Sequence, residues 1–164
     1  IEAIFFAMEL AKHVLVFCSS VDQAEWLQRI VPGSAVVSAK TKDKDREMIV
    51  QGFTRGKIQT VFNVGVFTTG FDFPELDGIV LLRPTKSIGL YTQMLGRGVR
   101  NAVGKKSCKV IDMTDTVNTI GKIETIELVK QDKWELVSER GMWHNKVLYD
   151  RIIQAKEDPY TITL

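Results

Sequence analysis

Two segments of the sequence carry side chains suited to binding phosphate. The first is Gln93-Met-Leu-Gly96-Arg97-Gly98-Val-Arg100, and on a helix Gln93, Arg97 and Arg100 would share one face. Guanidinium groups are planar and permanently charged, which suits recognition of a polyphosphate. Glycine inside a helix costs about 1 kcal/mol relative to alanine, so Gly96 and Gly98 indicate close approach of another group. The alternative interpretation is a solvated helix surface.

The second segment runs from Asn63 to Pro74 and follows an apolar run. Its hydroxyls, among them Thr68, and its backbone amides can hold a phosphate. Gly70 lets the backbone approach a ligand, and Asp72 can accept a hydrogen bond from a ribose hydroxyl. The alternative interpretation is an ordinary connection in which the glycines serve turn geometry.

Short apolar runs alternate with amphipathic segments along most of the chain. This alternation predicts an α/β fold with a parallel sheet covered by helices. The predicted strands are residues 14–18, 35–38, 59–63, 78–82 and 109–113, and the predicted helices are 2–12, 20–30, 40–55 and 87–100. Ligands of such sheets bind beyond the carboxyl ends of the strands, so we expect both phosphate-binding segments at that edge.

The helical segments also predict which side chains pack inward. In the helix that opens with the charged residues 40–47, Met48, Ile49 and Phe53 are expected to face the sheet, and Trp26 is expected to be a packing group. The basic cluster of Lys105, Lys106 and Lys109 is expected to be a solvated turn; contact with a nucleic-acid backbone is the alternative.

The last part of the chain has a different pattern. Residues 123–129 and 134–137 predict an antiparallel hairpin appended to the sheet, and residues 141–156 predict a helix that docks through an apolar face. We treat residues 118–164 as an extension packed on the same domain. Its role as a wedge, a partner-binding element or a brace stays open.

Length and composition exclude several classes of protein. The 164 residues are 45% hydrophobic, which indicates one globular domain. The net charge of +2 is too small to indicate nucleic-acid binding by itself. Cys18 and Cys108 lack metal-ligand spacing, so no metal site is predicted. No apolar stretch is long enough to span a bilayer and no signal peptide is evident, so we expect a cytoplasmic protein without a membrane partner.

Two signatures of nucleotide hydrolases do not occur in the sequence. The nearest match to a phosphate-binding loop, Gly52 to Lys57, has the wrong spacing, and there is no Asp-Glu dipeptide to hold magnesium. The chain can therefore complete a nucleotide site but can hardly build one.

Residues 14–20, 63–74 and 93–100 resemble, in this order and spacing, motifs IV, V and VI of superfamily 2 helicases. The resemblance is to the second RecA-like motor domain and covers residues 1–117. The form TTGFD followed by QMLGRGVR is most similar to DNA helicases and translocases of the UvsW, RadD and restriction-motor type.

This resemblance implies a nucleotide site shared with a preceding RecA-like domain of the parent chain. ATP and Mg²⁺ would be held mainly by that domain, so the present chain alone is expected to be inactive. Arg97 and Arg100 would be catalytic arginine fingers, with Arg100 the stronger candidate for the γ-phosphate. Gln93 would orient the same network, and Gly70 and Asp72 would meet the ribose and phosphate edge.

The resemblance also implies nucleic-acid contacts at Ser19, Arg46, Asn63 and Thr68. These would grip phosphates and read no base sequence. Several positions depart from the DEAD-box pattern, which favours DNA over RNA as the partner; among them, Asp43 replaces a glutamine. That departure leaves Arg46 with an alternative role as a solvated helix charge.

The sequence thus predicts the C-terminal motor domain of an ATP-dependent DNA helicase or translocase. One alternative is a non-catalytic adaptor that binds nucleic acid or protein and keeps the RecA-like fold. Another is the motor part of a restriction or repair nuclease, whose nuclease domain would lie outside this chain.

Overall fold

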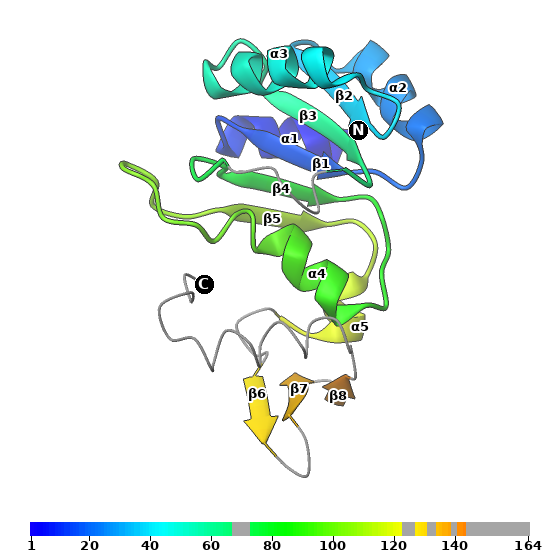
Figure 1. Cartoon of the computed structure of the whole chain (residues 1–164), viewed down its shortest axis with the longest axis vertical. Coiled ribbons are helices and arrows are strands. Elements are labelled where there is room, and N and C mark those ends of the chain that lie inside the picture. The colour runs from blue at the N-terminus through cyan, green and yellow to red at the C-terminus, as the bar shows by residue number, and fades with distance from the viewer. Residues whose placement is uncertain (67–72, 123–126, 131–133, 139–140, 144–164) are drawn as a thin grey trace.

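A five-stranded, fully parallel sheet forms the centre of the molecule (Figure 1). The computed structural model describes residues 1–66, 73–122, 127–130, 134–138 and 141–143. The strands are β1 (Val14–Phe17), β2 (Ser34–Ser38), β3 (Thr60–Val64), β4 (Gly78–Leu81) and β5 (Lys109–Asp112), and their order in the sheet is β2-β3-β1-β4-β5. The predicted parallel α/β fold is confirmed.

Helices cover both faces of this sheet. The helices α1 (Glu2–Leu10) and α2 (Val21–Ile30) pack on one face, and α3 (Asp43–Thr54) and α4 (Ile88–Leu95) pack on the other. Alternate residues of β1 enter the two cores: Val14 and Val16 face α1 and α2, whereas Leu15 and Phe17 face α3 and α4. Every residue of β1 and β4 is buried, which explains their uninterrupted apolar sequences.

Short polar residues and glycines define the helix ends. The side chains of Ser20 and Ser87 accept hydrogen bonds from backbone N–H groups in the first turns of α2 and α4. Gly56 follows α3 with φ +69°, a left-handed conformation that suits glycine. Ser20 and Ser87 thus fix where α2 and α4 begin, and Gly56 fixes where α3 ends.

Two predicted packing groups are instead exposed. Met48 of α3 is 55% exposed and Trp26 of α2 is 50% exposed. On α3 the inward stripe runs through Ile49 to Phe53, and Met48 precedes Ile49 by one residue, about 100° around the helix. Trp26 likewise precedes the buried Leu27 on α2. The prediction of their burial was wrong because neither residue lies on the apolar stripe.

The C-terminal part forms a second, three-stranded antiparallel sheet. After a short helix α5 (Thr116–Ile120), which the sequence analysis missed, come β6 (Glu127–Lys130), β7 (Trp134–Ser138) and β8 (Gly141–Trp143). The predicted hairpin is confirmed, but these strands pair with one another and not with the main sheet. The prediction that a helix begins at Gly141 was wrong. Residues 141–143 form β8, which follows β7 through a connection short enough for a hairpin. The remainder of that predicted helix lies outside the described residues.

We expect Phe53→Ala to destabilise the chain by about 3–5 kcal/mol, because it removes a fully buried ring that packs against His13 and Phe73. Met48→Ala on the same helix should change stability by less than about 0.5 kcal/mol. Urea unfolding followed by circular dichroism measures both. Equal losses would mean that the inward face of α3 is misassigned.

Candidate nucleotide and nucleic-acid sites

The helix that carries Gln93 ends before the two candidate arginines. α4 stops at Leu95, Gly96 is its C-cap, and the N–H of Gly98 donates to the carbonyl oxygen of Leu95 at 2.8 Å in a further turn. Arg97 and Arg100 therefore lie on the segment 96–100, which we call the arginine loop. The prediction that Gln93, Arg97 and Arg100 share a helix face was wrong, because the helix ends at Gly96.

The arginine loop lies at the amino-terminal edge of the sheet. α4 runs back from the end of β4, so its C-terminus approaches the beginning of β4 and β5 (Figure 1). Gly98 contacts Ile79, the second residue of β4, and Cys108, which immediately precedes β5. The expectation that both phosphate-binding segments share the carboxyl edge is therefore wrong for this one.

Close packing explains the glycine in the middle of the arginine loop. A Cβ atom built on Gly98 would lie 2.4 Å from Cys108 Sγ and 2.9 Å from Ile79 Cδ1. Close approach was predicted from the glycine, and the structure shows that the approaching groups belong to the protein's own core. Gly98 thus brings the backbone of the arginine loop against the sheet.

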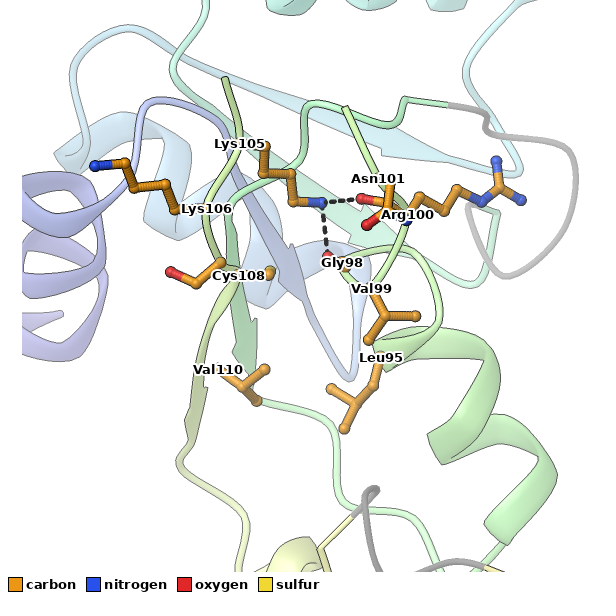
Figure 2. Close-up of a pocket in the computed structure, with 10 residues that line it drawn as sticks. Leu95, Gly98, Val99, Arg100, Asn101, Lys105, Lys106, Cys108 and Val110 are labelled. Atoms are coloured by element: carbon orange, nitrogen blue, oxygen red, sulfur yellow. Dashed lines mark hydrogen bonds between the residues drawn. The ribbon is translucent and has the colours of Figure 1, made fainter. Parts of the chain in front are cut away.

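Lys105 holds the arginine loop through backbone carbonyl groups. Its Nζ donates to the carbonyl oxygens of Gly98 at 2.6 Å, Arg100 at 2.8 Å and Pro74 at 2.9 Å. Figure 2 shows the first two bonds. Burial lowers the pKa of the Lys105 ammonium, although Cys108, Asp77 and Glu75 oppose that shift. The predicted solvated turn is wrong at Lys105, and no local sequence pattern signals this role.

The polar side chains of this region are partly exposed. Gln93, Arg97 and Arg100 all have intermediate burial. Burial lowers the pKa of Arg97, but a guanidinium remains charged at neutral pH. Arg100 also lines a cavity of about 300 Å³ together with Asn101 and Lys105 (Figure 2). Two permanent cations on one fixed loop fit the triphosphate of a nucleotide.

The opposite, carboxyl edge brings Ser19 and Asn63 together. Ser19 follows β1, and Asn63 lies next to the last residue of the adjacent strand β3. The backbone N–H of Cys18 donates to the carbonyl oxygen of Asn63 at 2.9 Å. Ser19 is exposed and its Oγ donates to the carbonyl oxygen of Leu82 at 3.0 Å. Asn63 is buried, and its Oδ1 accepts a hydrogen bond from the N–H of Val66 at 3.2 Å. Ser19 thus presents a polar surface, whereas Asn63 shapes the backbone after β3.

Arg46 is held at the start of its own helix. Its Nη2 donates to the carbonyl oxygen of Thr41 at 3.2 Å, and its Nη1 lies 3.5 Å from Asp43 Oδ1. The residue that departs from the helicase pattern, Asp43, is therefore the ion-pair partner of Arg46. The Arg46 side chain is 32% exposed, which leaves part of it accessible to a phosphate.

Three candidate residues, Thr68, Gly70 and Asp72, lie outside the described residues. The described residues on either side of them lie at opposite edges of the sheet. Val66 follows β3 at the carboxyl edge, and Pro74 accepts a bond from Lys105 beside the arginine loop.

The sequence analysis passed over two basic residues at the carboxyl edge. Arg83 follows Leu82, whose carbonyl oxygen accepts the hydrogen bond from Ser19, directly after β4. Lys86 lies further along the same connection to α4. Arg83 is partly buried and Lys86 is exposed. Basic residues directly after an apolar strand are a signal that would have found them.

The fold is that of a helicase C-terminal domain. Residues 2–102 match the family "Helicase conserved C-terminal domain", and the chain belongs to this family. The parallel sheet flanked by helices is the RecA-like fold of such domains.

Named relatives agree with this assignment. The chain is 45% identical to a putative ATP-dependent helicase IRC3 of Saccharomyces cerevisiae over 76 residues, which is 46% of this chain and 11% of that protein. It is 36% identical to the type I restriction enzyme EcoKI endonuclease subunit of Escherichia coli over 101 residues, 57% of this chain and 9% of the relative. RNA helicases also occur among the relatives.

Solved structures share the fold at low sequence identity. One of them is helicase Lhr of Mycobacterium smegmatis bound to single-stranded DNA and AMP-PNP, with a TM-score of 0.59 at 20% identity. The match covers 73% of this chain and 17% of the Lhr chain. The chain thus spans only a small part of the length of these relatives. Within the described residues, no helix has the length and apolar character needed to cross a membrane.

Gly98→Ala is expected to destabilise the chain by about 1–3 kcal/mol, because the added Cβ overlaps Cys108 Sγ. Adding Cys108→Ala, which removes that sulfur, should restore part of the lost stability. Thermal or urea unfolding of the two single variants and the double variant measures the coupling. Strictly additive losses would contradict the assigned contact.

Proposed function

We propose that this chain is the C-terminal motor domain of an ATP-dependent DNA helicase or translocase. The observation that carries the proposal is the fixed arginine loop, with Arg97 and Arg100 held at one edge of the sheet. The exposed Ser19 lies at the other edge, where nucleic acid would bind. In this arrangement ATP and nucleic acid would bind at separate edges of one sheet.

Arg97 and Arg100 would donate to the phosphates of an ATP held mainly, together with Mg²⁺, by a preceding RecA-like domain. Gln93, at the end of α4, would orient the arginines, and Gly70 and Asp72 would line the ribose and phosphate edge. Bound ATP supplies the γ-phosphoryl group that hydrolysis releases. The two guanidiniums would stabilise the negative charge that develops in the transition state. An arginine finger contributes about 10³–10⁵ in rate, or roughly 4–7 kcal/mol.

Ser19, Thr68 and Arg46 would form the nucleic-acid side of the domain, and the buried Asn63 would shape the backbone beside them. Hydroxyl and amide groups at strand ends donate to phosphates and carry no base readout. Arg83 and Lys86, at the same edge, would add positive charge. Closure of the two motor domains around ATP would then move this grip along one strand.

We favour DNA as the partner and the cytoplasm as the location. The relative EcoKI is a restriction endonuclease subunit, and Lhr is named as bound to single-stranded DNA. The match to EcoKI also supports a second candidate, in which this domain is the motor of a restriction or repair nuclease. A nuclease domain elsewhere in the parent chain would distinguish that candidate.

In the parent chain, Arg100→Ala should lower kcat of nucleic-acid-stimulated ATP hydrolysis by about 10³-fold or more, with DNA affinity nearly unchanged. Arg97→Ala should also lower kcat, and the present chain alone should hydrolyse no ATP. Arg29→Ala, on the opposite face of the sheet, is the matched control and should retain wild-type turnover. Wild-type turnover in Arg100→Ala would contradict the proposal and favour an adaptor.

Single-stranded DNA should stimulate the parent chain's ATP hydrolysis more than RNA of the same sequence, and the DNA's base sequence should have little effect. The logarithm of DNA affinity against the logarithm of salt concentration should fall with a slope of about −0.7 per phosphate contacted. Arg46→Ala should make that slope shallower by about 0.7, the value for one phosphate contact, whereas Arg29→Ala should leave it unchanged. Stronger stimulation by RNA would reverse the choice of partner.

A further inference from the structure

Lys105 connects two segments that are distant in sequence. Its ammonium donates to Gly98 and Arg100 on the arginine loop and to Pro74, which lies 31 residues earlier in the chain. Pro74 is also two residues after Asp72, the candidate ribose contact. One side chain therefore joins the backbones of both segments implicated in nucleotide binding.

We propose that Lys105 is a positioning residue that holds the arginine loop in the geometry needed for ATP hydrolysis. This inference rests on the proposed function of Arg97 and Arg100. Lys105 reaches main-chain carbonyl oxygens on the loop, so it acts through Arg97 and Arg100 and not on ATP itself.

The chemistry of the ammonium suits this role. A lysine ammonium has three N–H donors and no acceptor, and here three carbonyl oxygens lie within 2.6–2.9 Å of it. An uncharged apolar side chain of similar length would leave all three carbonyl oxygens without this donor. The bonds at Gly98 and Arg100 bracket Val99, so they fix the course of the backbone that carries Arg100.

The local fold brings Lys105 into position. The N–H of Lys105 donates to the carbonyl oxygen of Ala102 at 3.1 Å, and Gly104 adopts φ +81°, which closes a tight turn directly after the arginine loop. This turn returns the chain over the loop. Gly98, packed against Cys108, keeps the same loop close to the sheet.

Lys105→Met in the parent chain tests the inference. A misplacement of about 1 Å at a reacting group can cost about 10²-fold, so we expect kcat for nucleic-acid-stimulated ATP hydrolysis to fall by about 10–100-fold. The affinity for a single-stranded oligonucleotide should stay unchanged, because the carboxyl edge is not touched. Lys106→Met is the matched control, since Lys106 is the exposed neighbour of Lys105, and it should retain kcat.

A chemical rescue separates positioning from a general loss of stability. In Lys105→Cys, the thiolate displaces bromide from 2-bromoethylamine and forms a thioether that ends in an ammonium at nearly the length of lysine. This treatment should restore most of kcat. Wild-type protein treated in parallel controls for Cys18 and Cys108, whose pKa values burial raises to about 12 and about 11. Low thiolate content makes both slow to react.

The outcomes distinguish this inference from the proposed function. If Arg100→Ala loses activity while Lys105→Met keeps it, or if aminoethylation leaves the Lys105→Cys variant slow, the positioning role of Lys105 is wrong and the proposed function stands. If the wild-type parent chain hydrolyses no ATP, or Arg100→Ala is fully active, the proposed function itself fails.

Discussion

Complete burial of the central strands is the constraint on which the rest of the structure depends. β1 and β4 are covered on both faces, so no polar chemistry can occur on the sheet surface. Functional groups are therefore restricted to the two edges of the sheet. The carboxyl edge presents Ser19 beside the end of β3, and the amino-terminal edge presents the arginine loop, because α4 returns the chain there. Two chemically different sites thus follow from one packing arrangement.

The arginine loop is itself held by groups that have no direct part in binding phosphate. Gly98 lets the loop contact Cys108 and Ile79, and Lys105 binds the carbonyl oxygens on either side of Val99. Hydrogen bonds from a charged donor contribute about 1.5–3 kcal/mol each, which is enough to favour one backbone geometry over others. Fixed geometry matters for an arginine finger, because its effect depends on preorganised charge at the transition state.

Short apolar runs in the sequence predicted the five strands, and the runs of β1 and β4 are uninterrupted because these two strands are buried on both faces. The end of α4, the exposure of Met48 and the role of Lys105 were predicted wrongly. The bond from Lys105 to Pro74 joins residues 31 positions apart, and no local pattern records such a contact. The candidate roles of Arg97 and Arg100 came from resemblance to helicases and stay predictions.

If the arginine loop completes an ATP site and Lys105 acts through it, Lys105 and Arg100 must be coupled in catalysis. A double-mutant cycle of Lys105→Met and Arg100→Ala, measured as kcat for nucleic-acid-stimulated ATP hydrolysis by the parent chain, measures this coupling. We expect Lys105→Met to slow the wild type strongly but to slow the Arg100→Ala variant far less, because the group that Lys105 positions is already absent. An equal reduction of kcat on both backgrounds would show that the two residues act independently and that Lys105 does not act through Arg100.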